Sequence, residues 1–272
     1  MNTIDISILV CGIGEMASSI ARRLFAEGYA VAIHQETPPR TLWRSMAFAD
    51  AWFDGGAQLD GFEARCVGKK MEFLYGLRGR SFIPVLRRPF LDVVEMWSWD
   101  VVVATADSGL KPQLLKNQAD ITIGLGPAFM AGDDCDMVME IDGSNPGEII
   151  KSGRAPERRP RGVTADFVDG CPVLTPVAGR FGSAMIIGTA VEAGALLGFI
   201  GDMPVPAPVT GKLRGLVRPG VDVTAGATIA EIAAVPHCLR AVKRNQLIAR
   251  SVAFAIEMET GGWTPVPFEG MR

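Results

Sequence analysis

The chain has 272 residues, of which 48% are hydrophobic and 21% charged, with a net charge of −3 and a pI of about 5.5. This length and composition predict one or two globular domains with enough apolar mass to bury a core. The acidic balance excludes the broad basic surface that a phosphate backbone requires, so no nucleic-acid partner is expected. No apolar run reaches the ~18 residues of a spanning helix and no signal-peptide pattern is present. We therefore expect a cytoplasmic protein without a membrane partner.

Cysteine and histidine usage restricts the metal chemistry of the chain. The five cysteines are widely spaced with no Cys-x-x-Cys pair, and the two histidines are His34 and His237. This pattern argues against a disulfide framework, a zinc knuckle and an iron–sulfur cluster, and it fits reduced, mostly buried thiols. Two histidines are too few for a multi-histidine centre. We therefore predict no metal site.

The first 36 residues have the pattern of a strand–helix–strand unit. Residues 6–11 form a continuous apolar run, typical of a strand buried on both faces. Residues 18–28 carry apolar side chains at helical spacing and end in a glycine, and residues 29–34 read as a second strand. Gly12, Gly14 and Ala17 form a Gly-x-Gly-x-x-Ala loop between the first strand and the helix.

Further strands are predicted at residues 99–104, 120–123 and 136–141, with a polar helix-like stretch at 111–118. Strands that alternate with helices predict an α/β fold with a parallel sheet. From residue 172 onward short β-like pieces follow at close spacing, and residues 239–258 have a helical pattern. The domains expected are a Rossmann-like nucleotide-binding domain at 1–145, a linker at 146–171, a β-domain at 172–236, and a C-terminal helix with an extended tail at 237–272.

The β-domain contains an internal repeat. Residues 176–200 align with residues 208–232 at an offset of 32, with nine identities in 25 positions. A duplicated set of short strands predicts two interlocked sheets with quasi-two-fold symmetry. The repeated half resembles the biotinyl/lipoyl barrel-sandwich family, whose carriers hold their modified lysine in the hairpin between the halves. Here that hairpin, residues 200–205, has no lysine, and Lys212 lies in the following strand. A structural or docking module is therefore expected rather than a carrier.

The glycine loop is the first candidate ligand site. Gly12 and Gly14 let the backbone approach a pyrophosphate, which would rest on the helix N-terminus beside Ala17. Glu36 follows the second strand and is placed to bind ribose hydroxyls, whereas Arg40 and Arg44 are placed to meet a phosphate. Glu15 stands in the loop itself, where a carboxylate would repel phosphate unless it points away. A tight strand–helix turn without any nucleotide is the alternative.

A second glycine loop follows the strand predicted at 120–123 and should lie at the same sheet edge. Its candidate ligand-binding residues are Gly124, Gly126, Pro127, Phe129, Gly132 and Asp134. Glycines permit close approach of a ligand, and the aspartates at 133, 134 and 136 can hold a metal or bind hydroxyls. The alternative is a turn in which an aspartate caps a helix.

Taken together, the first strand–helix–strand unit, the segment IGLGPAFMAGDDCDMVMEI and the lysine-free repeat resemble the accessory proteins of the selenium-dependent molybdenum-hydroxylase system. This YqeB type is loosely linked to XdhC/CoxI-like maturation factors. The resemblance covers residues 6 to about 255. It implies a helper in the maturation of xanthine-dehydrogenase-like enzymes. The positions that match are those of the two glycine loops, with Glu36 and Glu140.

Several positions depart from the pattern of that family. Its first loop usually reads Gly-Gly-Gly-Asp, where this chain has residues 12–15 as Gly-Ile-Gly-Glu. An Asp-Ala-Arg strand end is replaced by Ala104-Thr-Ala106, and an Arg-Gly-His segment by residues 142–145, Asp-Gly-Ser-Asn. These changes point to a divergent member with a different ligand or without the activity.

Three functions stay open at this point. The first is a molybdenum-hydroxylase maturation factor that binds NAD(P) or a molybdopterin-type nucleotide and serves a hydroxylase client. The second is an NAD(P)-dependent oxidoreductase, and the third is a non-catalytic scaffold that docks a partner through the β-domain. No catalytic residue is identified, so whether the chain is an enzyme stays open, as does the formation of a homo-oligomer.

Overall fold

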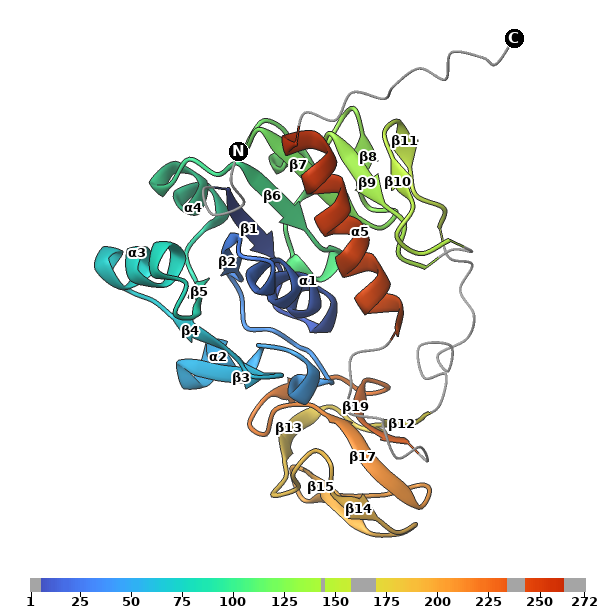
Figure 1. Cartoon of the computed structure of the whole chain (residues 1–272). Helices are drawn as coiled ribbons and strands as arrows, with labels where there is room; N and C mark the ends of the chain where they lie inside the picture. Colours follow the sequence, from blue (N-terminus) through green and yellow to red (C-terminus); the bar gives the residue numbers. More distant parts are fainter. Residues whose placement is uncertain (1–5, 143–144, 158–169, 234–242, 262–272) are drawn as a thin grey trace.

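The computed structural model describes residues 6–142, 145–157, 170–233 and 243–261. They form a mixed α/β fold with one large sheet, three smaller sheets and a C-terminal helix (Figure 1). The large sheet has nine strands, which in spatial order are β10 (Ile149–Ile150), β9 (Met137–Met139), β7 (Ile121–Leu125), β6 (Val101–Ala104), β1 (Ser7–Cys11), β2 (Ala30–His34), β5 (Ile83–Leu86), β4 (Phe62–Cys66) and β3 (Gly56–Leu59).

The strands from β9 to β4 run parallel, and the edge strands β10 and β3 are antiparallel to their neighbours. The chain leaves β1 to form β2 on one side and returns later to form β6 on the other side. The order of the strands therefore reverses between β1 and β6. In open α/β sheets, ligands bind in the crevice outside the carboxyl ends of the strands at such a reversal.

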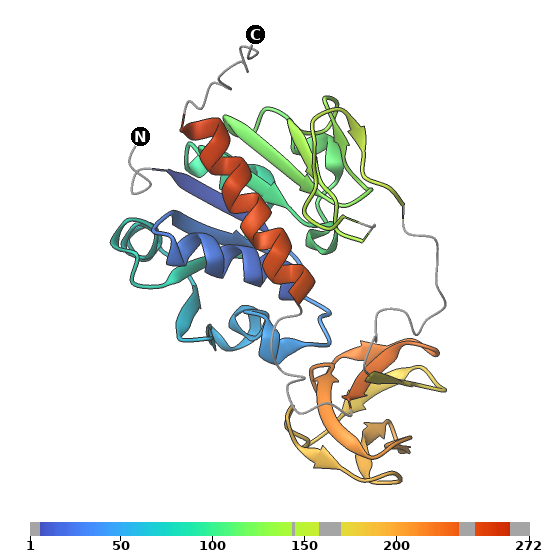
Figure 2. The same ribbon diagram turned by 45° about the vertical axis from the view of Figure 1, so that its right-hand side comes forward.

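Helices cover both faces of the large sheet. Alternate residues of β1 point to opposite faces: Ile8 and Val10 belong to one core cluster, and Leu9 and Cys11 to the other. The first cluster is covered by α1 (Glu15–Ala26) and α5 (Lys243–Thr260), which lie side by side in both views (Figures 1 and 2). The second is covered by α3 (Lys70–Gly79) and α4 (Phe90–Met96).

The smaller elements complete the first part of the chain. They are helix α2 (Asp50–Asp54), the 3-10 turns η2 (Arg44–Met46), η3 (Ala106–Ser108) and η4 (Pro112–Leu114), and the paired strands β8 (Met130–Ala131) and β11 (Gly153–Arg154). The polar helix expected at residues 111–118 is wrong, since only the turn η4 forms there. Leu115 is buried but Leu114 is exposed, so the stretch has too few buried side chains to hold a helix on the sheet.

Residues 170–233 form a separate set of short strands, which we call the β-unit (Figure 2). One sheet has the order β12 (Gly170–Leu174), β19 (Thr228–Ala233), β17 (Gly211–Leu216) and β14 (Ala190–Val191). The other has the order β16 (Met203–Pro206), β15 (Leu196–Ile200), β13 (Gly179–Gly182) and β18 (Asp222–Val223). Their side chains share one core, which includes Phe181, Leu213 and Ile229.

An offset of 32 residues converts one sheet of the β-unit into the other. It carries β12 onto β16, β13 onto β17, β14 onto β18 and β15 onto β19. Each sheet therefore takes two strands from each half of the repeat, which is the interlocked arrangement expected from the sequence. Pro172-Val173 and Pro204-Val205 are identical and extend the repeat to the N-terminal side. The hairpin between β15 and β16 contains no lysine.

The domain boundaries stay a prediction, but the structure adds two facts about them. Residues 149–150 and 153–154, within the stretch expected to be a linker, form strands that pair with β9 and β8. Helix α5, which the sequence assigns to the C-terminal segment, packs on α1 and so returns to the large sheet. Among the described residues, no helix combines the length and the apolar character needed to cross a membrane.

Candidate functional site

A cleft of about 640 Å³ opens at the carboxyl ends of β1, β2 and β6, where the strand order reverses. We call it the Trp43 cleft. Its lining residues come from the first loop and the start of α1, from the segments after β2, β6 and β9, and from the β-unit: Gly14, Glu15, Met16, Gln35, Pro39, Arg40, Thr41, Leu42, Trp43, Thr105, Ala106, Asp107, Ile141 and Thr228. Its volume falls in the range typical of pockets that hold cofactor-sized molecules.

The loop of Gly12 and Gly14 forms the floor of the cleft. Gly12 has a φ of +114°, and Gly14 is the residue that precedes α1. A Cβ at Gly12 would lie 2.1 Å from Thr105 Oγ1, and a Cβ at Gly14 would lie 2.2 Å from Asp107 Oδ2. Thr105 Oγ1 donates a hydrogen bond to the carbonyl oxygen of Cys11 at 2.9 Å. The glycines are therefore required by the close approach of the segment that follows β6.

Two carboxyl groups of the cleft lie at this loop. Asp107 is exposed, and its Oδ2 lies against Gly14. Glu15 is the first residue of α1, and burial raises the pKa of its carboxyl group. The Asn245 side chain and the positive charges of Arg244 and Arg214 oppose that rise. A pyrophosphate placed on this loop would meet negative charge.

A polar cluster connects Glu15 to the start of α5. Asn245 is fully buried, and its side chain lies close enough to Glu15 to lower the pKa of that carboxyl group. Neither atom of its amide, however, makes a well-formed hydrogen bond among the described residues. The same holds for Glu15 Oε2 and Arg244 Nε. Arg244 Nη1 donates a hydrogen bond to Asp142 Oδ1 at 2.7 Å. Buried polar atoms in native proteins almost always have a partner, so this cluster leaves room for a water or a ligand atom.

The β-unit holds the wall of the cleft formed by Leu42 and Trp43. Leu216 N donates to Leu42 O at 2.9 Å, and Arg44 Nε donates to Leu216 O at 3.0 Å. Trp43 Nε1 donates to Glu231 Oε2, and Glu231 is fully buried and paired with Arg214 at 2.8 Å. Through these contacts, residues 42–44 lie alongside the end of β17.

A second set of charge contacts joins the β-unit to α2. Arg218 Nη2 lies 2.5 Å from Asp54 Oδ1, and Arg218 Nη1 lies 3.1 Å from Asp50 Oδ1. The Arg218 guanidinium donates hydrogen bonds to the Asp54 carboxylate, and these lower the pKa of Asp54. Arg44 Nη1 bonds the same Asp50 at 2.8 Å, so Arg44 is engaged in the interface and does not line the cleft.

The predicted residues of the first loop divide into two groups. Gly14, Glu15 and Arg40 line the cleft, whereas Gly12 and Ala17 are buried beneath its floor. Glu36 is exposed after β2 and does not line the cleft; Gln35 does. Their part in ligand binding stays a prediction.

The second glycine loop lies outside the Trp43 cleft. Gly124 leaves space for Phe129, whose Cγ would lie 2.4 Å from a Cβ at that position, and Phe129 is buried. Gly126 and Gly132 adopt positive φ values in the turn between β7 and β9. The carbonyl oxygen of Pro127 accepts a hydrogen bond from Arg154 at 3.1 Å. Asp134 Oδ2 accepts a hydrogen bond from Met130 N at 2.9 Å, so it closes the turn.

His34 and Cys11 are both buried and are engaged in packing. His34 is buried, and its Nε2–H donates to the carbonyl oxygen of Arg88 at 2.9 Å. Burial lowers the pKa of His34, which keeps the ring neutral. Cys11 is fully buried at the end of β1, and burial raises the pKa of its thiol far above the usual range. His237 lies outside the described residues. Among the described residues no group of three or more metal-ligating side chains occurs.

The sequence did not single out Trp43, Thr105, Asp107 or Asn245. Thr105 and Asp107 follow β6 directly, so the rule for sheet reversals gives a signal for them once β6 is placed beside β1. Trp43 stands in a segment without periodicity. Asn245 lies in a helix more than 200 residues from the loop it approaches, and no local pattern indicates it.

The sheet and the cleft define a mixed α/β protein with a cleft at the carboxyl edge of its large sheet, bordered by a duplicated β-unit. A relative among known proteins is the uncharacterised protein YqeB of Escherichia coli (strain K12). It is 34% identical over 197 residues, which cover 70% of this chain and 35% of YqeB. The match thus spans about a third of the length of YqeB. No protein-family model matches the chain.

Solved structures give weaker likenesses. Urea carboxylase of Kluyveromyces lactis matches 30% of this chain and 8% of its own, with 25% identity and a TM-score of 0.23. The ectoine utilization protein EutE (DoeB) of Ruegeria pomeroyi matches 85% of this chain and 86% of its own, with 13% identity and a TM-score of 0.26. A succinylglutamate desuccinylase of Silicibacter sp. TM1040 matches 85% of both chains, with 15% identity and a TM-score of 0.27. Scores this low carry no argument about fold or function.

Proposed function

We propose that this protein is an accessory factor in the maturation of a molybdenum hydroxylase and binds a dinucleotide or molybdopterin-type nucleotide in the Trp43 cleft. The observation that carries the proposal is the position of the cleft. It lies where the strand order reverses, over a glycine loop and the N-terminus of α1. The motif resemblance to accessory proteins of the selenium-dependent molybdenum-hydroxylase system supports the biological context, and so does the similarity to YqeB.

The negative charge of Asp107 at the floor of the cleft affects whether a diphosphate binds there alone or together with a cation. Asp107 Oδ2 lies against Gly14, so a bare diphosphate on the loop would be repelled. Magnesium in nucleotide sites is commonly held by one or two carboxylates together with the phosphates of the ligand. We therefore propose that the diphosphate binds as its magnesium complex. Asp107 would supply a carboxylate to the ion, which would neutralise charge at the loop.

The β-unit has a structural part in this proposal. Its interlocked, quasi-symmetric sheets support a barrel-sandwich fold of the biotinyl/lipoyl kind. The hairpin between β15 and β16 has no lysine to modify. Instead, the hydrogen bonds of Trp43 and Arg44 to Glu231 and Leu216 let the β-unit hold the wall of the cleft in place. Thr228 of β19 also lines the cleft directly.

The oxidoreductase alternative has less support from the cleft. No histidine or tyrosine is among the residues that line it, so no side chain of the kind that usually exchanges a proton during hydride transfer is present there. A scaffold function remains compatible with the β-unit. The ligand experiment separates these alternatives.

The test is calorimetric titration of the full-length protein with NAD, NADH and a molybdopterin dinucleotide extracted anaerobically from a molybdenum hydroxylase. Each titration is run with magnesium chloride and again with EDTA. We expect saturable binding of the molybdopterin dinucleotide that depends on magnesium. Binding of NADH alone would favour the oxidoreductase, and binding of none would contradict a nucleotide site.

The biological part of the proposal has its own test. Deletion of the gene in the source organism should lower the specific activity of its molybdenum hydroxylases while their polypeptides accumulate normally. Complementation with the wild-type gene is the control. Unchanged hydroxylase activity in the deletion strain would contradict a maturation function.

A further inference from the structure

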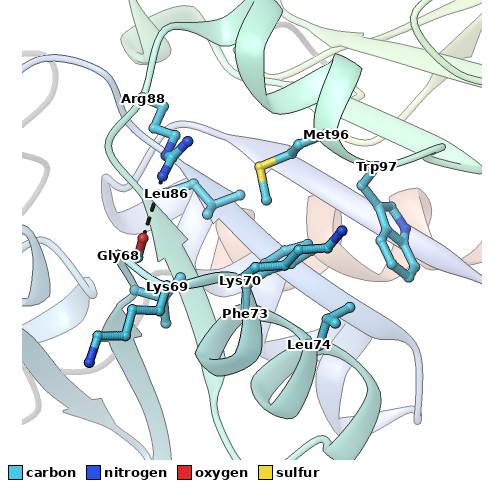
Figure 3. Close-up of a pocket in the computed structure, with 10 residues that line it drawn as sticks. Gly68, Lys69, Lys70, Phe73, Leu74, Leu86, Arg88, Met96 and Trp97 are labelled. Atoms are coloured by element: carbon cyan, nitrogen blue, oxygen red, sulfur yellow. Dashed lines mark hydrogen bonds between the residues drawn. The ribbon is translucent and has the colours of Figure 1, made fainter.

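A second cavity, distinct from the Trp43 cleft, lies on the face of the large sheet that α3 and α4 cover. Its volume is about 220 Å³. Val67 and Gly68 follow β4, Leu86 ends β5, and Arg88 follows β5. The remaining lining residues lie at the start of α3 and at the end of α4 (Figure 3). It shares no lining residue with the Trp43 cleft. We call it the Trp97 pocket.

Positive charge gathers at the mouth of the Trp97 pocket. Lys69, Lys70 and Arg88 are all exposed, and the structure shows no ion pair for any of them within the described ranges. Arg88 Nη2 makes a long hydrogen bond of 3.4 Å to the carbonyl oxygen of Gly68. Glu72 is the acidic side chain at this end of α3, and its Oε2 is engaged by Gly68 N and Lys69 N at 3.4 and 3.3 Å. Three cations and one carboxylate leave an excess of positive charge.

The inner wall of the same pocket is apolar and aromatic. Phe73 and Trp97 meet edge to face with ring centroids 5.8 Å apart, and Met96 and Leu74 complete the wall. In Figure 3 the Lys70 side chain extends across Phe73 toward Trp97. Flat rings and a thioether favour contact with another flat, polarisable group.

The ring nitrogen of Trp97 indicates that this wall is incomplete. Nε1 of Trp97 is buried and has no hydrogen-bond partner within the described part of the chain. The nearby Trp99 Nε1, in contrast, donates to the carbonyl oxygen of Val93 at 3.1 Å. Buried indole N–H groups usually find an acceptor, so an acceptor from outside the chain would satisfy this one.

From these observations we infer that the Trp97 pocket is a binding site for a small organic anion with a flat, ring-sized apolar body. The body packs against Phe73, Met96 and Trp97, and the carboxylate or phosphate meets Lys70 and Arg88. An engineered apolar cavity of about 150 Å³ holds one benzene ring. A cavity of about 220 Å³ therefore has room for one or two fused rings. This site does not rest on the function proposed for the Trp43 cleft.

The experiment uses 1-naphthoate as the probe and the full-length protein. Binding is followed by calorimetry and by the indole ¹H–¹⁵N resonance of Trp97, which is assigned with a Trp97→Phe variant. We expect one saturable site that shifts the Trp97 resonance. Two matched compounds, the neutral 1-naphthalenemethanol and inorganic phosphate, should each bind at least about ten-fold more weakly, since each lacks one of the two contacts. Equal binding of either matched compound would overturn the inference.

Charge variants give the second readout. The double variant Lys70→Gln, Arg88→Gln should weaken 1-naphthoate binding about ten-fold, as expected for two exposed ion pairs of ordinary strength. The double variant Lys111→Gln, Arg180→Gln makes the same change of net charge at exposed sites outside both cavities and should bind normally. No saturable binding by the wild type, or equal loss in both double variants, would overturn the inference.

Discussion

Asp107 is the single side chain that most restricts what the Trp43 cleft can bind. Its carboxylate lies against Gly14, where the phosphates of a dinucleotide would otherwise sit. The sequence predicted that Gly12 and Gly14 admit a ligand. The structure shows that the same glycines also admit Thr105 and Asp107, residues 90 positions away or more. Only the pairing of β1 with β6 brings them together, and pairing at that distance leaves no local pattern.

The variant Asp107→Asn tests the charge at the loop. We expect ADP without magnesium to bind about five-fold more tightly, since removing one unit charge about 4 Å from another is worth about 1 kcal/mol in water. The increase in ADP affinity that magnesium chloride produces should be smaller in this variant than in the wild type. Calorimetry with EDTA and with magnesium chloride measures both effects. Asp92→Asn, an exposed aspartate outside the cleft, is the control, and an equal response of both variants would contradict the assignment.

Glu15 makes the stability of the fold depend on pH. Burial raises its pKa above the usual 4.5, so the native protein holds this proton more tightly than the unfolded chain does. The contribution of Glu15 to stability is therefore greatest below pH 4.5 and falls as the pH rises through the native-state pKa. In Glu15→Gln that loss is absent. Urea unfolding across the pH range should show the variant gaining stability relative to wild type as the pH rises.

The exposed Glu192→Gln is the matched control for that experiment. Its stability difference from wild type should stay constant with pH. A constant difference for Glu15→Gln as well would show that burial of Glu15 has no thermodynamic effect.

Among the elements, the segment at residues 42–44 is one of the two places where the β-unit is joined to the rest of the described chain, the other being α2. Five strands of the large sheet, β1, β2, β6, β7 and β9, could be predicted because short apolar runs such as residues 6–11 and 99–104 are typical of strands buried on both faces. The duplication of the β-unit could be predicted from its glycines and prolines. The joint between them could not, because a Trp and an Arg in an irregular segment acquire their partners, Glu231 and the carbonyl oxygen of Leu216, only in the folded chain.

The variant Arg214→Met tests this joint. It leaves the fully buried carboxylate of Glu231 without its ion-pair partner, at 2.8 Å in the wild type. Breaking one side of a buried pair typically costs about 3 kcal/mol of unfolding free energy. Urea unfolding measures the loss. Arg180→Met removes an exposed arginine from the same β-unit and should lose far less. Equal losses would mean that the Arg214–Glu231 pair, which holds the carboxylate that Trp43 contacts, does not stabilise the fold.

At the scale of the whole molecule, α5 comes from the C-terminal part of the sequence but packs on α1, which comes from the N-terminal part. Residues 239–258 were predicted as a helix from their apolar spacing, and α5 forms at Lys243–Thr260. The surface that α5 covers could not be predicted from its apolar spacing. Ile248, Val252 and Ile256 belong to the same core cluster as residues of α1 and β1. In the sequence, the whole β-unit lies between α1 and α5.

Replacing one apolar side chain of α5 tests that packing. Ile248 is fully buried, and Ile248→Ala should lower the free energy of unfolding by about 3 kcal/mol through lost burial and the cavity left behind. Its neighbour Leu247 is 47% exposed, and Leu247→Ala should change stability by no more than about 0.5 kcal/mol. Chemical denaturation of the two variants provides the comparison. Similar losses would contradict the packing of α5 on the sheet.

The position of α5 also sets an order of events during synthesis. The ribosome releases β1, α1 and the rest of the large sheet first, then the β-unit, and only afterwards the helix that covers α1. At about 5–20 residues per second, the roughly 100 residues between β11 and the end of α5 take about 5–20 s to appear. Throughout that interval the nascent chain presents the bare apolar side of α1 to the cell. Chaperone capture of the arrested nascent chain should therefore end once residues 243–260 have left the exit tunnel.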